Sequence, residues 1–235
     1  MITALIIAGG SGNRTMQSVP KQFLTVNDVP VIVFTMKNVQ NVSQIDDIVV
    51  VGPEGWENFI YAYAKQFGIS KLKKVVIGGK TRHESIYNGL CYLESQGAGG
   101  KICICDGNRP MVPQSVILET LSLSEQCDCA VCVEPCYDSM FLSNNGEVMS
   151  GNIDRATLYK GTAPECAELL SMLEVYRQAN AQQMTELSTT GLFLHFGKKV
   201  LAAKGSIKCF KITTAEDFEL FKALLDAEPL NNIVK

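Results

Sequence analysis

The sequence predicts an α/β fold, a Rossmann-like three-layer arrangement whose mostly parallel, twisted sheet carries a projecting β-arm. Three observations predict this class. Strand and helix patterns alternate from the start of the chain, as they do in doubly wound sheets. The first pattern, Ile2–Ile7, is apolar nearly throughout, as a strand buried on both faces requires. Glycine-rich loops follow several strands, at the places where such sheets hold ligands.

The first half of the chain supplies the regular elements. Gly52-Pro53 ends the second strand and Gly78-Gly79 ends the third, because glycine and proline interrupt regular structure. The intervening segments have helical patterns. The predicted strands span 2–7, 47–51, 75–77 and 101–105. The predicted helices span 31–42, 56–67 and 113–125, and a further helix follows residues 80–85 and ends near 94.

A cluster of cysteines comes next, and it admits two interpretations. Cys127, Cys129, Cys132 and Cys136 are close enough in sequence to suggest a zinc site, whose ligands are usually paired on loops. The run 127–134 instead has the pattern of a buried strand, with Cys127 and Cys129 on one face and Cys132 on the other. We favour the strand, because free cysteine behaves as a small buried hydrophobe, a role we also expect for Cys103 and Cys105.

The pattern changes to short, polar segments at about 135–164, which we predict to be an arm projecting from the sheet. Asn144-Asn145-Gly146 is predicted to form a hairpin turn between strands at 140–142 and 148–149. Helices are expected at 165–180 and near 183–188, then a strand at 199–201 and an extended piece ending at 211–213. Thr214 should cap the last helix, with Asp217 completing an approximate capping box.

The composition narrows the possible functions. The chain has 235 residues without an evident linker or repeat, so we expect a single domain, 1–235, including the arm. A net charge of −3 disfavours general nucleic-acid binding. Met1 leads directly into the apolar strand, and no apolar run approaches the roughly 20 residues that a membrane helix needs. We therefore expect a cytoplasmic protein that binds neither nucleic acid nor membrane, with its nine cysteines reduced.

Three loops carry residues suited to a polyphosphate. The first, Ala8-Gly9-Gly10-Ser11-Gly12-Asn13-Arg14, is followed by a second cation at Lys21. Its glycines allow backbone N–H groups to approach phosphate oxygens, although a tight turn with two solvated cations would have the same pattern. Gly78-Gly79 and Asp106–Pro110 end strands at the same carboxyl edge, which predicts one shared crevice.

Five motifs in order carry a family resemblance. They are Gly9-Gly10-x-Gly12-x-Arg14 with Pro20-Lys21-Gln22-Phe23; Gly78-Gly79-x-x-Arg82-x-x-Ser85; Asp106-x-x-Arg109-Pro110; Arg155; and Lys211-Ile212-Thr213-Thr214-x-x-Asp217. From Ile2 to about Leu225 the chain resembles the CTP-dependent cytidylyltransferases that act on 2-C-methyl-D-erythritol 4-phosphate or D-ribitol 5-phosphate. The resemblance implies an enzyme, a nucleotidyltransferase that uses CTP, a polyol phosphate and Mg²⁺.

The resemblance also implies a role for each matched residue. The residues implied in CTP binding are Ala8, Gly9, Gly10, Gly12, Gly79, Lys80, Ser85 and Asp106, and those implied in catalysis are Arg14, Lys21 and Lys211. Asp106 would hold Mg²⁺, and Arg109 would brace its loop. The implied acceptor-binding residues are Ser139, Arg155, Thr162 and Lys211, with Ser139 and Arg155 supplied by the arm of a partner subunit in a homodimer.

The expected chemistry suits this set of residues. A phosphate oxygen of the acceptor attacks the α-phosphorus of CTP and expels pyrophosphate, so catalysis consists mainly of aligning and neutralising two anions. No general base is needed, because a phosphate monoester is already ionised near neutral pH. The two histidines, His83 and His195, are therefore expected to be structural or solvated.

Four departures from the family pattern lie on or near the acceptor side. Cys105 replaces a histidine, Gly161–Glu165 replaces a Gln-Thr-Pro-Gln stretch, Thr185-Glu186 replaces a Thr-Asp pair, and Lys211 lacks the usual preceding Asn. We expect D-ribitol 5-phosphate as the acceptor, giving a CDP-alditol for a cell-surface polymer. The alternatives are the isoprenoid enzyme that uses methylerythritol phosphate, a catalytically silent CTP-binding paralogue, and a sugar-1-phosphate nucleotidyltransferase that uses another base.

Overall fold

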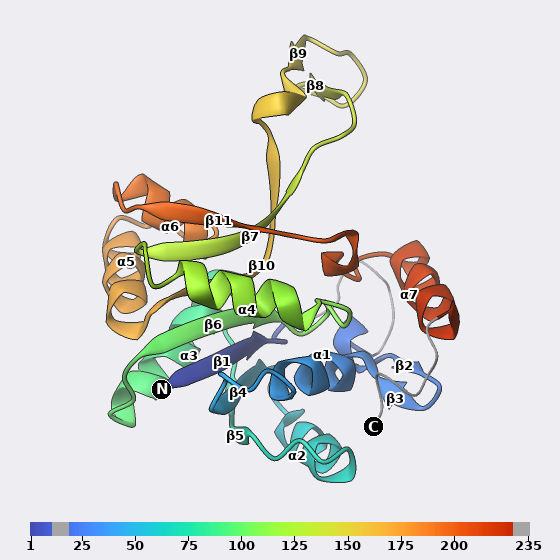
Figure 1. Ribbon diagram of the computed structural model, residues 1–235, viewed down its shortest axis with the longest axis vertical. Coiled ribbons are helices and arrows are strands. Elements are labelled where there is room, and N and C mark those ends of the chain that lie inside the picture. The colour runs from blue at the N-terminus through green and yellow to red at the C-terminus, as the bar shows by residue number, and fades with distance from the viewer. Residues whose placement is uncertain (11–18, 228–235) are drawn as a thin grey trace.

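A seven-stranded sheet forms the centre of the computed structural model, which describes residues 1–10 and 19–227 (Figure 1). The strand order is β11-β7-β10-β6-β1-β4-β5, and β10 alone runs antiparallel to its neighbours. The sheet strands are β1 (Ile2–Ile7), β4 (Asp47–Gly52), β5 (Leu72–Ile77), β6 (Lys101–Asp106), β7 (Cys129–Pro135), β10 (Tyr159–Glu168) and β11 (Val200–Lys204).

Helices cover both faces of this sheet, so the predicted three-layer fold is confirmed. The helices are α1 (Val31–Gln40), α2 (Glu57–Gln66), α3 (Arg82–Ser95), α4 (Gln114–Leu123), α5 (Leu169–Ala181), α6 (Thr189–His195) and α7 (Ala215–Ala227). Alternate side chains of β1 point to opposite faces, as the two-residue period of a strand requires. Ala4 and Ile6 pack with α1, α2 and α4, whereas Leu5 and Ile7 pack with α3, α5 and α6. No helix of the described residues is long and apolar enough to cross a membrane.

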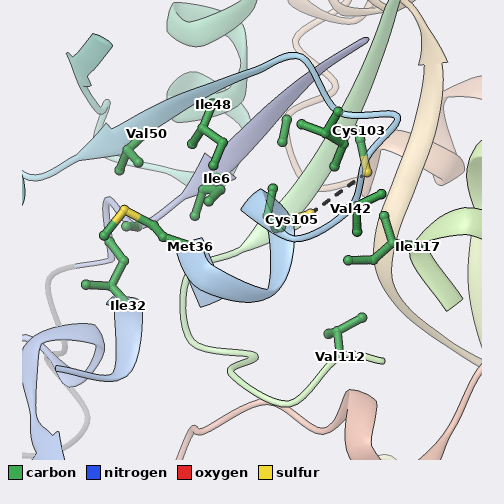
Figure 2. Close-up of a cluster of buried hydrophobic side chains, with 14 of the residues drawn as sticks. Ile6, Ile32, Met36, Val42, Ile48, Val50, Cys103, Cys105, Val112 and Ile117 are labelled. Carbon is green, nitrogen blue, oxygen red and sulfur yellow. Dashed lines mark hydrogen bonds between the residues drawn. The ribbon is translucent and has the colours of Figure 1, made fainter. Parts of the chain in front are cut away.

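The core on the α1 side is built from aliphatic side chains and cysteines (Figure 2). Ile6, Ile32, Met36 and Ile48 are fully buried there. Truncating one such side chain to alanine costs about 2–5 kcal/mol. Cys103 and Cys105 lie in the same layer with their sulfur atoms 3.9 Å apart, which confirms their predicted burial.

Cysteines of β7 alternate between the two layers, as predicted. Cys129 belongs to the core on the α3 side and Cys132 to the core on the α1 side. Cys127 departs from the prediction, because it precedes β7 in a bend, where its thiol donates to the carbonyl of Leu123. Within residues 1–10 and 19–227, no group of three or more His, Cys, Asp or Glu side chains could hold a metal ion.

Strand β10 was missed by the sequence analysis. The predicted helix at 165–180 begins only at Leu169, because Glu165–Glu168 continue β10 between β6 and β7. Glu165 faces Ile104 of β6 and Val131 of β7 in the register. Pairing with two strands remote in sequence outweighs the local helical pattern here.

Two further expectations for the second half were wrong in position. No helix occurs near 183–188, because Gln183 has a φ of 58° and ends the helical path; the helix that follows is α6, capped by the hydroxyl of Ser188. In the arm, β8 (Met140–Leu142) pairs with β9 (Gly151–Ile153) instead of with 148–149. The side chains of Ser143 and Asn145 organise the longer loop between them by bonding its backbone.

Figure 1 shows β8 and β9 at the tip of an arm that projects from the sheet, between the end of β7 and the start of β10. Segment 211–213 lies outside the sheet, and Ile212 exchanges backbone and side-chain hydrogen bonds with Asn108. Thr214 and Asp217 form the predicted capping box at α7, with the Asp217 carboxylate accepting from the Thr214 backbone and the Thr214 hydroxyl accepting from Asp217. These contacts fix the preceding Lys211 beside the loop after β6.

Candidate functional site

Loops from the carboxyl ends of β1, β5 and β6 enclose a first cavity of about 230 Å³, as the sequence predicts for one shared crevice. Segment 211–213 adds Lys211 to its wall. The cavity is lined by Ile7, Ala8, Gly9, Gly10, Gln22, Gly79, Lys80, Thr81, Arg82, Ser85, Asp106, Asn108 and Lys211. Seven of the eight residues predicted to bind CTP are in this set; the eighth, Gly12, lies outside the described residues with Arg14.

The loop before α3 is built so that its backbone lines the first cavity. Thr81 caps α3 by accepting from the Glu84 backbone N–H at 3.1 Å, and the Glu84 carboxylate accepts from the Lys80 N–H at 2.7 Å. The Ser85 hydroxyl accepts from the Gly79 N–H at 3.1 Å. A Cβ at Gly79 would lie 2.3 Å from the Cβ of Glu84, so only glycine fits there.

Asp106 is the buried anionic centre of the site. It is 5% exposed, and three cations contact its carboxylate: Arg109 at 3.0 Å, with Arg82 and Lys211 each at 3.3 Å. Burial opposes the ionisation of Asp106, but attraction from these three cations outweighs it and holds the pKa of the carboxyl well below its usual range. Asp106 is therefore ionised at neutral pH.

Arg82 and Glu165 extend this ion pair into a charged cluster of five residues: Arg82, Asp106, Arg109, Glu165 and Lys211. Arg82 donates to Asp106 and, at 3.1 Å, to Glu165, which is 3% exposed. Burial opposes the charged form of Arg82, yet Asp106 and Glu165 together raise its pKa above the usual value. The other oxygen of Glu165 accepts from the backbone and hydroxyl of Thr190 at 2.8 and 2.7 Å.

Sequence reasoning missed both members of this extension. Arg82 stood in a matched motif, which was the available signal, but it received no role. Glu165 stood out only as a departure from the Gln-Thr-Pro-Gln stretch. Neither position indicates its partner, because the Arg82–Glu165 contact joins residues 83 apart in the chain.

A second cavity, of about 650 Å³, adjoins the first on the side of β7, β10 and α6. It is lined by Thr81, Arg82, His83, Asp106, Arg109, Val131, Val133, Tyr159, Gly161, Thr162, Glu165, Tyr176, Thr185, Glu186, Leu187, Ser188, Thr190, Gly191, Leu194, Val200 and Lys211. The walls of the two cavities share Thr81, Arg82, Asp106 and Lys211. The predicted acceptor residue Thr162 lies in this second wall, with its hydroxyl donating to the Cys132 carbonyl at 3.2 Å.

Three predicted site residues do not line either cavity. Lys21 is buried, and its ammonium donates to the carbonyl of Thr213. Ser139 and Arg155 are exposed in the arm, where the Arg155 guanidinium donates to the Tyr137 carbonyl. The arm of a single chain therefore does not bring these two residues to the charged cluster.

The two histidines differ in their surroundings, and His83 is among the residues that line the second cavity. His83 is 4% exposed, and its Nε2 lies 2.7 Å from the Asn180 side-chain oxygen. Its ring also packs on Tyr176. His195 is exposed at the end of α6. Cys105, which stands where the resemblance implies a histidine, is buried in the core.

The charged cluster fits Mg²⁺ only together with a phosphorylated ligand. Mg²⁺ takes about six oxygen ligands and is commonly bound through one or two carboxylates plus substrate phosphates. Asp106 offers the carboxylate that lines both cavities, whereas Glu165 lines only the second. Phosphate oxygens and water would have to complete the set, as they do in other nucleotide sites.

Comparisons with known proteins bear on the family and the fold of the chain. The model of the IspD family, 2-C-methyl-D-erythritol 4-phosphate cytidylyltransferase, matches residues 2–227. Ribitol-5-phosphate cytidylyltransferase from Lacticaseibacillus paracasei is 32% identical over 98% of this chain and 100% of its own. 2-C-methyl-D-erythritol 4-phosphate cytidylyltransferase from Petrotoga mobilis is 29% identical over 96% and 99%. A solved structure of 4-diphosphocytidyl-2C-methyl-D-erythritol synthase from Anaerococcus prevotii has a TM-score of 0.83 at 23% identity, covering 96% of each chain, and so supports the fold.

Proposed function

The chain belongs to the IspD family of cytidylyltransferases, and from that premise we propose that it transfers CMP from CTP to D-ribitol 5-phosphate, releasing pyrophosphate. The observation that carries the proposal is the pair of adjoining cavities whose shared wall holds Arg82, Asp106 and Lys211. Two phosphorylated substrates bound on either side of this wall would place their phosphates next to the same cations.

The charges of the shared wall suit the reaction. An oxygen of the acceptor phosphate forms a bond to the α-phosphorus, and the bond from that phosphorus to the pyrophosphate oxygen breaks. Both reactants are anions, so alignment and neutralisation supply most of the rate enhancement. Lys211 and Arg82 contact both cavities and would neutralise charge where the two phosphates meet. Arg14 and Lys21 are proposed to contribute cations to the triphosphate.

CTP would occupy the first cavity. Backbone N–H groups of Gly9, Gly10 and Gly12 are proposed to contact the triphosphate, as in other glycine-rich loops. Gly79, Lys80 and Ser85 are proposed to contact the cytosine and ribose from the loop before α3. Mg²⁺ would be held by Asp106 with phosphate oxygens, and when bound it supplies further neutralisation of the transferring phosphoryl group.

The polyol phosphate would occupy the second cavity. Hydroxyl-bearing and carboxylate side chains line it, including Thr162, Thr185, Glu186 and Ser188, and these can pair with the hydroxyls of an open-chain polyol. The ribitol-5-phosphate enzyme from Lacticaseibacillus paracasei aligns over 98% of this chain at a slightly higher identity than the Petrotoga mobilis enzyme, which favours ribitol. Methylerythritol phosphate is the alternative acceptor. A CDP-ribitol product would serve cell-surface polymer synthesis from the cytoplasm.

The arm is proposed to complete the acceptor site of a second subunit. Its side chains Tyr137, Phe141, Leu142, Val148 and Met149 are apolar and more than half exposed in the single chain. Exposed apolar surface on a projecting segment suits an interface. Ser139 and Arg155, which do not reach the cavities of their own chain, would then contact the acceptor of the partner.

The test is pyrophosphate release from each of the four nucleoside triphosphates, with Mg²⁺ and a panel of polyol and sugar phosphates. We expect turnover with CTP and D-ribitol 5-phosphate. Lys211→Met should lower kcat by about 10²–10³, the scale of losing one transition-state donor. CTP binding without turnover of any acceptor would support the silent paralogue instead, and turnover with another triphosphate would support the sugar-1-phosphate alternative.

A further inference from the structure

Arg82 occupies the boundary between the two proposed substrate sites. Its guanidinium contacts Asp106, which lines both cavities, and Glu165, which lines only the second. The side chain is 35% exposed and lines both cavities, so it remains open to ligands. Because the acceptor oxygen must attack the α-phosphorus where the two sites meet, this guanidinium lies at the place where the reacting phosphates converge.

Glu165 fixes the position of that guanidinium. One carboxylate oxygen is held by two donors from Thr190 at the start of α6, and the other accepts from Arg82 at 3.1 Å. Glu165 is 3% exposed and lies on β10 between β6 and β7, so neither its backbone nor its carboxylate can move far. A carboxylate that is held on both sides is a rigid anchor for an arginine.

The charge of the cluster also depends on Glu165. Three cations, Arg82, Arg109 and Lys211, face two carboxylates, which leaves one formal positive charge in this group. With glutamine at position 165 the excess would be two, and the amide nitrogen or the amide oxygen would face Arg82. A neutral amide therefore replaces a charged anchor with a weak or unfavourable contact.

We propose that Glu165 is a positioning residue that anchors Arg82 between the CTP and acceptor cavities and so couples the acceptor wall to Asp106. The proposal rests on the proposed CMP transfer, which assigns the two cavities to the two substrates. It adds that an acceptor-side residue which never contacts CTP controls the rate of the chemical step. Misplacing a reacting group by about 1 Å can cost about 10²-fold in rate.

The test compares Glu165→Gln with wild type under saturating CTP and the acceptor that the panel prefers. We expect kcat to fall at least about tenfold, a conservative share of the loss from misplacement, while KM for CTP changes less than about threefold. The matched control is Glu168→Gln, which removes the same charge from the same strand at an exposed position paired with Lys101. The control should keep the wild-type kcat.

A double-mutant cycle tells positioning from a general charge effect. If Glu165 acts through Arg82, then Glu165→Gln should cost little more in an Arg82→Lys background, whereas independent effects would multiply. Multiplying effects, or an unchanged kcat with lower KM for both substrates, would overturn the proposal. The substrate panel decides the proposed function separately, because it uses only the wild-type chain.

A charge-conserving variant covers the case in which Glu165→Gln folds poorly. Glu165→Asp keeps the negative charge, but its shorter side chain cannot reach Thr190 and Arg82 together. We expect a kcat between those of wild type and Glu165→Gln, with KM for CTP unchanged and a melting temperature near that of wild type. A wild-type kcat for Glu165→Asp would show that the anchor geometry is unimportant and would contradict the proposal.

Discussion

Replacing Asp106 by asparagine removes the one carboxylate that three cations share. The variant keeps the shape of the side chain, but an amide NH₂ then faces guanidinium and ammonium groups that it cannot accept from. Arg109 is the most affected cation, because it is 9% exposed and its guanidinium donates to Asp106 and to the Cys209 carbonyl. The variant therefore leaves a buried cation without its anionic partner.

The expected loss of stability follows from the burial of these partners. Breaking a buried ion pair by removing one partner costs about 3–5 kcal/mol. Arg82 and Lys211 are each 35% exposed and can regain water, so we discount that range for solvent screening and expect about 1–3 kcal/mol. For a chain of this size, each kcal/mol shifts Tm by about 2–4 °C. Asp106→Asn should therefore melt about 2–12 °C below wild type at pH 7.

The pH dependence of the Tm difference gives an independent test of this reasoning. The pKa of Asp106 is lowered in the folded chain, so its contribution is complete above the unfolded value of about 4 and is lost as pH falls towards the folded value. The Tm difference between wild type and variant should stay constant from pH 7 to about 5 and narrow below about 4. Differential scanning calorimetry across this range measures it.

A surface carboxylate provides the control. Asp47 pairs with Lys73, which is 57% exposed, so Asp47→Asn should cost at most about 1 kcal/mol. An Asp106→Asn variant as stable as this control at pH 7 would refute the reasoning. A Tm difference that widens on acidification would also refute the reasoning. It would mean that the pKa of Asp106 is higher in the folded chain than in the unfolded chain.

Three further outcomes are expected. Gly79→Ala forces a Cβ to within 2.3 Å of Glu84, so the loop before α3 must shift and KM for CTP should rise at least about tenfold; an unchanged KM would remove this loop from the nucleotide site. Mixing inactive Arg14→Ala and Arg155→Ala chains should restore activity. Each site of the proposed dimer combines Arg14 of one chain with Arg155 of the other, so a mixed dimer has one site with both substitutions and one site with neither; a monomer by light scattering would exclude this. D-ribitol 5-phosphate should exceed methylerythritol phosphate by at least about tenfold in kcat/KM, and an equal or reversed preference would favour the isoprenoid alternative.

Much of the fold could be predicted because its signals are local. Ile2–Ile7 and Asp47–Gly52 are short apolar runs, and glycines follow the strands where the cavity forms. The parallel order of these strands then places their carboxyl ends at one edge, so the position of the crevice follows from topology alone. Asp106 could be predicted as a site residue for the same reason.

The rest depends on pairing between remote segments. Strand β10 contains Ala163-Pro164 and the charged Glu165, and nothing within the strand indicates that it inserts between β6 and β7. The shift of the predicted helix to Leu169 has the same origin. Lys21 stays a predicted phosphate ligand, and the sequence near it does not indicate the contact of its ammonium with the Thr213 carbonyl, 192 residues away.

Glu165 shows why the missed strand matters for function. A buried carboxylate in a central strand is unfavourable unless charged or donor groups compensate it, and here Arg82 and Thr190 do so. Locally unfavourable residues that the surrounding structure compensates tend to occur at functional sites. Glu165 therefore adds an anchor to the wall of the second cavity. Because that anchor reaches Asp106 through one guanidinium, acceptor-side substitutions that disturb it should change the turnover of CTP with every acceptor, and not only the choice among them.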